Sequence, residues 1–100
     1  MYGLIGRMTA IPGERDALLA ILTESTGAMP GCLSYVIAKD IEDENGIWIT
    51  EVWDREASHR ASLSLPAVRD AIQRAKPLIA GFDTHIVTAP VGGHGISRGD

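Results

Sequence analysis

Glu51, Trp53 and His59 form the group of residues in this chain that is best suited to do chemistry. They bring a carboxylate, an indole and an imidazole together within nine positions. Glu51 and Trp53 alternate along a predicted strand, so their side chains are expected on the same face. Asp54 stands where it can cap a helix that follows at once, and His59 then falls on the second turn of that helix. An imidazole that titrates near neutrality, set beside an aromatic wall, could move a proton in a small apolar pocket.

Three further side chains could line such a pocket. Tyr35 lies on the second predicted strand, and His85 lies on the last strand, where it is expected to share a face with Asp83 and Val87. Arg69 lies at the edge of the apolar stripe of the last helix, from which it could reach a phenolate. Tyr35 is also consistent with an ordinary core residue, and Arg69 with a solvated or interface residue.

The first three candidates have ordinary interpretations as well. Trp53 could be an aromatic residue of the core or of a dimer interface. Glu51 lies between apolar residues on its strand and must find a partner if it is buried, either His59 or an arginine of a second copy. His59 could be a half-exposed helix residue that pairs with Glu51 or Asp54.

Hydrophobic periodicity predicts the elements that would position these residues. The expected elements are strands at 2–10, 33–39, 47–53 and 82–89, and helices from 14 to about 26, at 55–63 and from 66 to about 76. The apolar stripe of the first helix comprises Leu18, Ile21, Leu22 and Ser25, and that of the last helix comprises Val68, Ala71, Ile72, Ala75 and Ile79. Asn45-Gly46 indicates a hairpin between the second and third strands, which should therefore pair antiparallel.

The order β-α-β-β-α-β, with the second helical segment split in two, predicts an α+β fold of ferredoxin-like type with a four-stranded antiparallel sheet. The strands are apolar on both faces. The third strand has Ile49 and Trp53 on one face, and Trp48 and Val52 on the other. Helices can cover one face, and the same face of a second copy is the simplest cover for the other. The sequence therefore predicts a homodimer.

Composition narrows the classes of function. One hundred residues allow one domain, expected at 1–90, followed by a glycine-rich tail at 91–100 that is expected to be flexible. The net charge of −4 offers no basic patch for nucleic acid, and no apolar run approaches the roughly 20 residues that cross a membrane. Cys32 is the only cysteine, so no internal disulfide is expected. These features favour a cytoplasmic protein.

Neither a metal nor a nucleotide cofactor is expected. The three histidines are scattered, and the acidic loop at 40–44 lacks the spacing of a calcium loop. No glycine-rich dinucleotide fingerprint precedes a predicted helix.

The chain resembles the antibiotic biosynthesis monooxygenase (ABM) family over roughly residues 2–89. The resemblance lies in Pro12-Gly13, in the run from Pro30 to Tyr35 (PGCLSY), and in the run from Glu51 to Ala57 (EVWDREA) that leads to His59. It implies a dimeric α+β barrel, and the oxygenation of a hydroxylated aromatic such as a quinol or anthrone without flavin, haem or metal. Haem-degrading relatives use an Asn on the first strand, where this chain offers Gly6 and Arg7.

The sequence thus predicts a homodimeric, cofactor-independent monooxygenase that acts on a small aromatic substrate with dioxygen. In this hypothesis His59 is the catalytic base, and Trp53, Glu51, His85, Tyr35 and Arg69 bind the substrate. Three alternatives remain open. They are a ligand-binding or stress-response module without catalysis, an isomerase of a small carbonyl metabolite, and a structural dimerisation unit whose cavity is filled by side chains.

Overall fold

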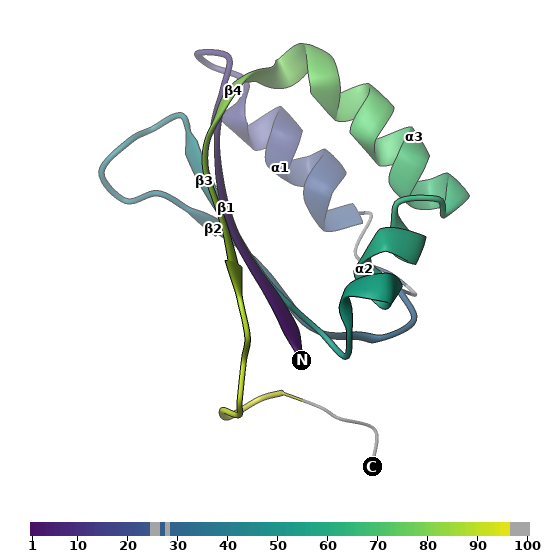
Figure 1. Cartoon of the computed structure of the whole chain (residues 1–100). Coiled ribbons are helices and arrows are strands. Elements are labelled where there is room, and N and C mark those ends of the chain that lie inside the picture. The colour runs from purple at the N-terminus through teal and green to yellow at the C-terminus, as the bar shows by residue number, and fades with distance from the viewer. Residues whose placement is uncertain (25–26, 28, 97–100) are drawn as a thin grey trace.

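The computed structural model describes residues 1–24, 27 and 29–96. In chain order the elements are β1 (Tyr2–Ala10), α1 (Arg15–Glu24), β2 (Cys32–Lys39), β3 (Gly46–Trp53), α2 (Glu56–Ser62), α3 (Pro66–Ala75), a short 3₁₀ turn η1 (Lys76–Leu78), and β4 (Ile79–Thr88). The strands form one antiparallel sheet in the order β2-β3-β1-β4. All three helices lie on one side of this sheet (Figure 1). The predicted ferredoxin-like α+β fold, with its split second helical segment, is confirmed.

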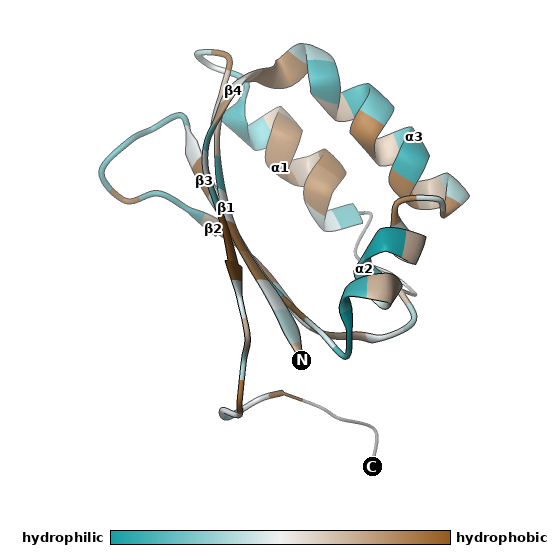
Figure 2. Ribbon diagram, viewed as in Figure 1, coloured by the Kyte–Doolittle hydropathy of each residue, from teal (hydrophilic) through white to brown (hydrophobic). Residues whose placement is uncertain are grey.

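The core lies between the sheet and the helices. Strand residues that face the helices come from alternate positions, as the pleat requires. Thus Met8 of β1 stands opposite Ile47 of β3, and both are buried. The cluster of buried apolar residues comprises Met8, Ala10, Leu18, Ile47, Ile49 and Ala75. Figure 2 shows α1 largely hydrophobic and α3 alternating between hydrophobic and hydrophilic residues, as expected for helices that bury one side only.

The loop between β2 and β3 closes the predicted hairpin, and Asn45 and Gly46 form the second half of its last turn, in which the Gly46 N–H donates to the Asp43 carbonyl at 3.0 Å. Gly46 begins β3 and does not adopt a positive φ. The side chains of Asp40 and Asp43 accept hydrogen bonds from the backbone N–H groups of Glu42 and Asn45, at 2.8 and 2.9 Å. Short aspartate side chains that bond the backbone two residues on are a common way to form a turn.

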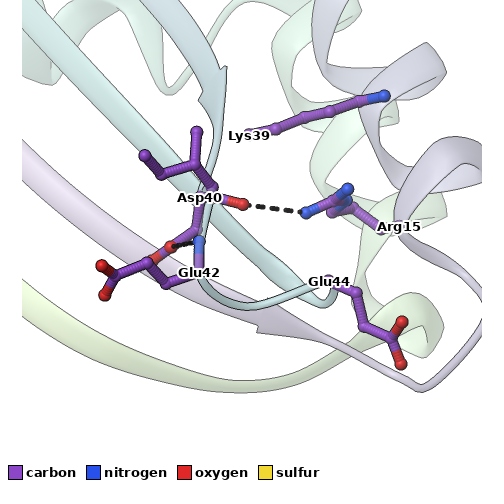
Figure 3. A pocket seen from close by; sticks show the side chains of 6 residues that line it. Arg15, Lys39, Asp40, Glu42 and Glu44 are labelled. Atoms are coloured by element: carbon purple, nitrogen blue, oxygen red, sulfur yellow. Dashed lines mark hydrogen bonds between the residues drawn. The ribbon is translucent and has the colours of Figure 1, made fainter.

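Arg15 holds this loop from the start of α1. Its Nη1 donates to the backbone carbonyl oxygens of Asp40, Asp43 and Gly46, the shortest at 3.0 Å. Figure 3 shows the guanidinium reaching the Asp40 carbonyl beside an open hollow of about 620 Å³. That hollow is lined mostly by charged residues of the loop, and none of the predicted site residues lies in it.

A charged cluster lies on the outer face of the sheet, which is the face away from the helices. The guanidinium of Arg7 contacts the carboxylates of Asp40, Asp43 and Asp83 at 3.1, 2.8 and 2.6 Å. It also lies over the Trp48 ring, 5.9 Å from the ring centroid. The pKa of Arg7 is raised, chiefly by its hydrogen bonds to Asp43 and Asp40.

The prediction that Asp83 shares a face with His85 is wrong. The pairing of β1 with β4 shifts register between Arg7 and Met8, so that Asp83 has no partner in the ladder. This bulge turns the Asp83 side chain toward Arg7 and Thr9 on the outer face. His85 pairs with Gly6 and Val87 with Leu4, so both keep the helix-facing side.

Two other details of the elements differ from the sequence prediction. β4 begins at Ile79 rather than at residue 82, because α3 gives way to the turn containing Pro77 and Ile79 then extends into the sheet. Asp54 does not cap α2; the N-cap is Arg55, with no side-chain hydrogen bond. The predicted end of the first helix and its stripe residue Ser25 lie outside the described residues. Within the described parts of the chain, no helix is long and apolar enough to span a membrane.

Candidate active site

A cavity of about 290 Å³ lies between the helix-facing side of the sheet and the helices. Its wall is largely aliphatic, with polar groups from Glu51, His59, Ser62 and Lys76. The Ser62 hydroxyl is already used, since it donates to the backbone carbonyl of His59 at 2.6 Å. The apolar lining comprises Met8, Leu22, Met29, Ile49, Trp53, Leu63, Val68, Ala71, Ile72, Ala75, Ile79 and Phe82, with Tyr35 completing the wall. The alternative of a dimerisation unit filled by its own side chains does not fit this space.

Glu51, Trp53 and His59 meet on one wall of this cavity. The Trp53 indole Nε1 donates a 3.0 Å hydrogen bond to Oε1 of Glu51. His59 Nε2 lies 4.0 Å from the same oxygen. The His59 ring also packs against the Trp53 ring, edge to face, with centroids 5.4 Å apart, and against Tyr2 at 5.8 Å. One carboxylate thus fixes the indole and faces the imidazole, and its Oε2 accepts no hydrogen bond from the residues that the structure describes.

Backbone geometry explains why these three side chains converge. Glu51 and Trp53 are two residues apart on β3 and therefore project to the same face. The chain then turns at once into α2, which brings His59 back over the end of the strand. Trp53 is almost fully buried there, so its position is fixed by packing as well as by its hydrogen bond.

Gly31 fixes the approach of α2 to the sheet. It has a φ of +86°, a conformation that favours glycine, and its carbonyl accepts the backbone N–H of Asp54 at 2.9 Å. A β-carbon at this position would lie 2.6 Å from Ser58 and 2.8 Å from the Asp54 carboxylate. Ser58 precedes His59 on α2, so the absence of a side chain at Gly31 sets how closely the helix that carries the imidazole can approach.

Tyr35 also lines the cavity, from β2. It stands opposite Glu51 in the β2–β3 ladder. Burial, and to a smaller extent the nearby negative charge of Glu51, raise the pKa of the Tyr35 phenol above its usual range. The phenol therefore remains protonated at neutral pH and can donate a hydrogen bond to a ligand.

The remaining predicted site residues are placed differently. His85 lies on the helix-facing side of β4 and lines a second hollow that adjoins the main cavity. Arg69 is exposed on α3 and is not part of the cavity wall. The structure thus brings Glu51, Trp53, His59 and Tyr35 together, sets His85 beside them, and leaves Arg69 outside.

Sequence reasoning missed several residues that shape the site. Tyr2 contacts the His59 ring because it pairs with Trp53 across β1 and β3, and no short-range pattern reveals that register. The sequence pattern places Val68 and Ile72 on the apolar stripe of the last helix, which indicates core residues. Their spacing of four positions does place them on one helix face, and that face proves to line a cavity.

The family model for antibiotic biosynthesis monooxygenase matches residues 1–74 of the chain. This chain belongs to that family. The match includes the Glu51, Trp53 and His59 cluster and ends within α3. Among curated proteins, no relative matches.

Solved structures agree with the assignment to the ABM family. A candidate antibiotic biosynthesis monooxygenase from Chloroflexus aurantiacus J-10-fl is 64% identical, with a TM-score of 0.94, and the match covers 96% of this chain and 98% of that one. A candidate enzyme of the same description from Deinococcus radiodurans is 28% identical, with a TM-score of 0.72 and 97% of both chains covered. Rv0793 from Mycobacterium tuberculosis, at 21% identity and a TM-score of 0.78 over 93% of this chain and 97% of that one, shares the fold.

Proposed function

We propose that this ABM-family protein is a monooxygenase that oxidises a small hydroxylated aromatic of the quinol or anthrone type with dioxygen, without a cofactor. The observation that carries the proposal is the apolar cavity with the Glu51 and His59 pair on its wall. At about 290 Å³ the cavity lies near the lower end of the range for small-molecule sites, roughly 300–1,000 Å³. It therefore suits a small planar ligand.

The proposed reaction needs little from the protein beyond a base, orientation and an apolar chamber. His59 removes a phenolic or benzylic proton from the substrate. The resulting anion is electron-rich and passes an electron to dioxygen. Joining of the two radicals gives a carbon-bound peroxide anion, which takes the proton back from His59. The hydroperoxide then loses water and leaves a carbonyl. In total a CH₂ group and O₂ become a C=O group and H₂O, so the substrate supplies all the electrons.

The neighbours of His59 suit the role of a base. The Glu51 carboxylate, 4.0 Å away, stabilises the imidazolium that forms when the proton arrives. The hydrogen bond from Trp53 keeps the carboxylate in place, and the rings of Trp53 and Tyr2 hold the imidazole. The aliphatic wall lowers the polarity around this pair, and charges interact more strongly where the dielectric is low.

Oxygen consumption tests the proposal directly. Purified protein, treated with chelator and free of any chromophore, is mixed with a panel of quinols and anthrones while dissolved oxygen is followed by electrode. We expect substrate-dependent oxygen uptake above the spontaneous rate, with a carbonyl product identified by mass spectrometry.

Controls separate the alternatives. His94 belongs to neither cavity, so His94→Ala should react like the wild type, whereas His59→Ala should not. Binding of an aromatic without oxygen uptake across the whole panel would instead identify a ligand-binding module. Turnover of a carbonyl compound under strict anaerobiosis would identify an isomerase.

We also propose that the protein is a homodimer joined through the outer face of the sheet. No helix covers this face (Figure 1). It carries Val36 and Ile86, which are about half exposed, beside the partly exposed Ile5 and Val52. Burial of such apolar surface stabilises association by roughly 25 cal/mol per Å² removed from water, before the costs of association are subtracted.

Sedimentation velocity at micromolar concentration tests the dimer. We expect the wild type to sediment as a dimer, and Val36→Asp combined with Ile86→Lys to sediment as a monomer that keeps its helical and sheet signals. Ile41 is almost fully exposed on the β2–β3 loop, so Ile41→Lys serves as the control and should stay dimeric. A monomeric wild type would refute this part of the proposal.

A further inference from the structure

A second hollow, of about 370 Å³, adjoins the candidate active site on the helix-facing side of the sheet. It shares Met8, Ile49, Glu51 and Phe82 with the main cavity. Its remaining wall comes from β1 and β4, with Gly6, Arg7, Thr84 and His85. Glu51 thus borders both spaces, and a ligand bound beside its carboxylate has room to extend toward β4.

The second hollow exists because Gly6 has no side chain. On β1, Gly6 lies between Leu4 and Met8 on the helix-facing side, and it stands opposite Ile49 of β3 and His85 of β4. Leu4 and Met8 are both buried, so the gap over Gly6 interrupts an otherwise packed row. A β-carbon at Gly6 would meet only the Thr84 carbonyl oxygen, at 3.7 Å, an ordinary van der Waals contact. Neither packing nor backbone conformation therefore requires glycine at this position.

Phe82 forms the wall between the two spaces. It pairs with Met8 beside the bulge in β4, and it lines both the main cavity and the second hollow. Its side chain is unusually open for a phenylalanine, with 75% of the residue exposed. An aromatic ring held at the mouth of an apolar cavity offers a face or an edge on which a flat ligand can pack.

We propose that the hollow over Gly6 is a second subsite, which receives the second ring of a fused-ring hydroxylated aromatic while the first ring lies beside Glu51 and His59. Gly6 leaves the floor of the subsite open, Phe82 packs on the ring, and His85 lies at the far side within reach of a polar substituent. This inference rests on the proposed function, because the first ring must be held in the main cavity. Gly6 and Phe82 are then the residues that set the size of substrate the enzyme accepts.

Binding of a matched pair of ligands tests the subsite without any turnover. Phenol carries one ring and 1-naphthol carries two, and affinities are measured by titration calorimetry under argon. The added ring buries further apolar surface, so the wild type should bind 1-naphthol about tenfold more tightly than phenol. Gly6→Val should remove this tenfold preference and leave phenol binding within about twofold of the wild type. Phe82→Ala should weaken 1-naphthol binding about fivefold, the scale of one aromatic pair.

The chain offers a matched control. Gly81 is also a strand glycine, a β-carbon there would meet nothing within 4 Å, and it lines neither space. Gly81→Val should therefore leave both affinities unchanged. Gly6→Ala, which adds only the tolerated β-carbon, provides a second variant if Gly6→Val does not fold, and it should shift the preference in the same direction.

The outcomes distinguish the two proposals. If the wild type binds both ligands equally well, or if Gly6→Val weakens both to the same extent, the subsite is refuted while the main cavity stands. If the wild type binds neither ligand, the aromatic-binding cavity of the proposed function is refuted, and the subsite with it.

Discussion

Two clusters of charged and aromatic side chains lie on opposite faces of the same sheet, and they differ in how fully their polar atoms are hydrogen-bonded. On the outer face, Arg7 contacts three carboxylates and the ring of Trp48, whose indole nitrogen also donates to Asp40 at 3.0 Å. On the helix side, Glu51 accepts a single hydrogen bond, from Trp53, and faces His59 at 4.0 Å. The first cluster has nearly every polar atom engaged, whereas the second borders about 290 Å³ of space.

The difference separates a structural role from a role at the candidate active site. A charged group whose hydrogen-bonding capacity is filled by its own chain joins elements together, as Arg7 joins β1, the β2–β3 loop and β4. The Glu51 carboxylate instead faces His59 on the wall of an apolar cavity, so its charge can act on the imidazole beside a bound ligand. The four predictions below test this distinction, beginning with the largest expected effect.

Removal of the proposed base should have the largest effect. His59→Ala should lower kcat at least about 100-fold, since a positioned general base contributes roughly 10²- to 10⁴-fold. The melting temperature should fall as well, because the variant loses the contacts of the His59 ring with Tyr2 and Trp53, so kcat is compared at a temperature where both proteins are folded. Steady-state oxygen uptake and thermal unfolding are measured on the same preparation. A variant that keeps wild-type kcat would exclude His59 as the base.

The charge of Glu51 should matter less than the base itself. Glu51→Gln keeps an oxygen that can accept the indole N–H of Trp53, but it removes the negative charge that faces His59. We expect kcat to fall about tenfold, which is about 1.4 kcal/mol of lost transition-state stabilisation, with ligand affinity nearly unchanged. A loss confined to KM would show that Glu51 binds the substrate and does not assist the base.

Disruption of the outer cluster should affect stability and leave the cavity intact. Arg7→Met leaves three carboxylates without their cation, so at pH 7 the midpoint of denaturant unfolding should fall while phenol binding stays at the wild-type level. The pKa values of Asp40 and Asp43 are lowered, first by the N–H groups of Glu42 and Asn45 and next by Arg7.

The sign of the pH dependence follows from these lowered pKa values. The stabilisation is present above the unfolded aspartate pKa of about 3.9 and is lost as the pH falls through the lower folded values. The stability difference between wild type and Arg7→Met should therefore shrink below about pH 4. A constant difference down to pH 2 would contradict the assigned role of the cluster.

The smallest effect should appear only in alkali. The pKa of Tyr35 is raised, so its contribution to stability is complete below the unfolded tyrosine pKa of about 10 and is lost as the pH rises further. Tyr35→Phe removes the titrating group, so it should be less sensitive than the wild type to pH above about 10. Denaturant unfolding at pH 8 and pH 11 provides the comparison, and parallel losses in the two proteins would argue against a buried phenol.

The order of the elements could be predicted because the pattern that identifies each element lies within its own residues. Alternation in β3 and the four-residue spacing in α3 are properties of neighbouring residues, and both proved correct. The face shared by Glu51 and Trp53 followed from the same rule. The bulge beside Asp83 could not be predicted in this way, because it depends on the register between β1 and β4, and these strands are separated by most of the chain.

The candidate site could likewise be predicted only where its residues are close together in the sequence. His59 and its two partners lie within nine residues of sequence, so local geometry brings them together. Arg69 was placed by its position on a helix stripe, yet the rotation of α3 leaves it outside the cavity wall. Tyr2 and Phe82 reach the site only through strand pairing, and Gly6 contributes by having no side chain, which no search for reactive groups would detect.

Gly31 shows where the position of the candidate base could be changed by mutation. His59, the proposed base, lies 28 positions further along the chain. Its distance from the sheet nevertheless depends on how closely the neighbouring Ser58 can approach Gly31, which has no β-carbon. Mutagenesis confined to the residues of the cavity wall would include neither Gly31 nor Ser58. A library that varies the residues leading into β2, together with smaller residues at position 58, would instead move the imidazole together with α2 and leave every residue of the cavity wall unchanged.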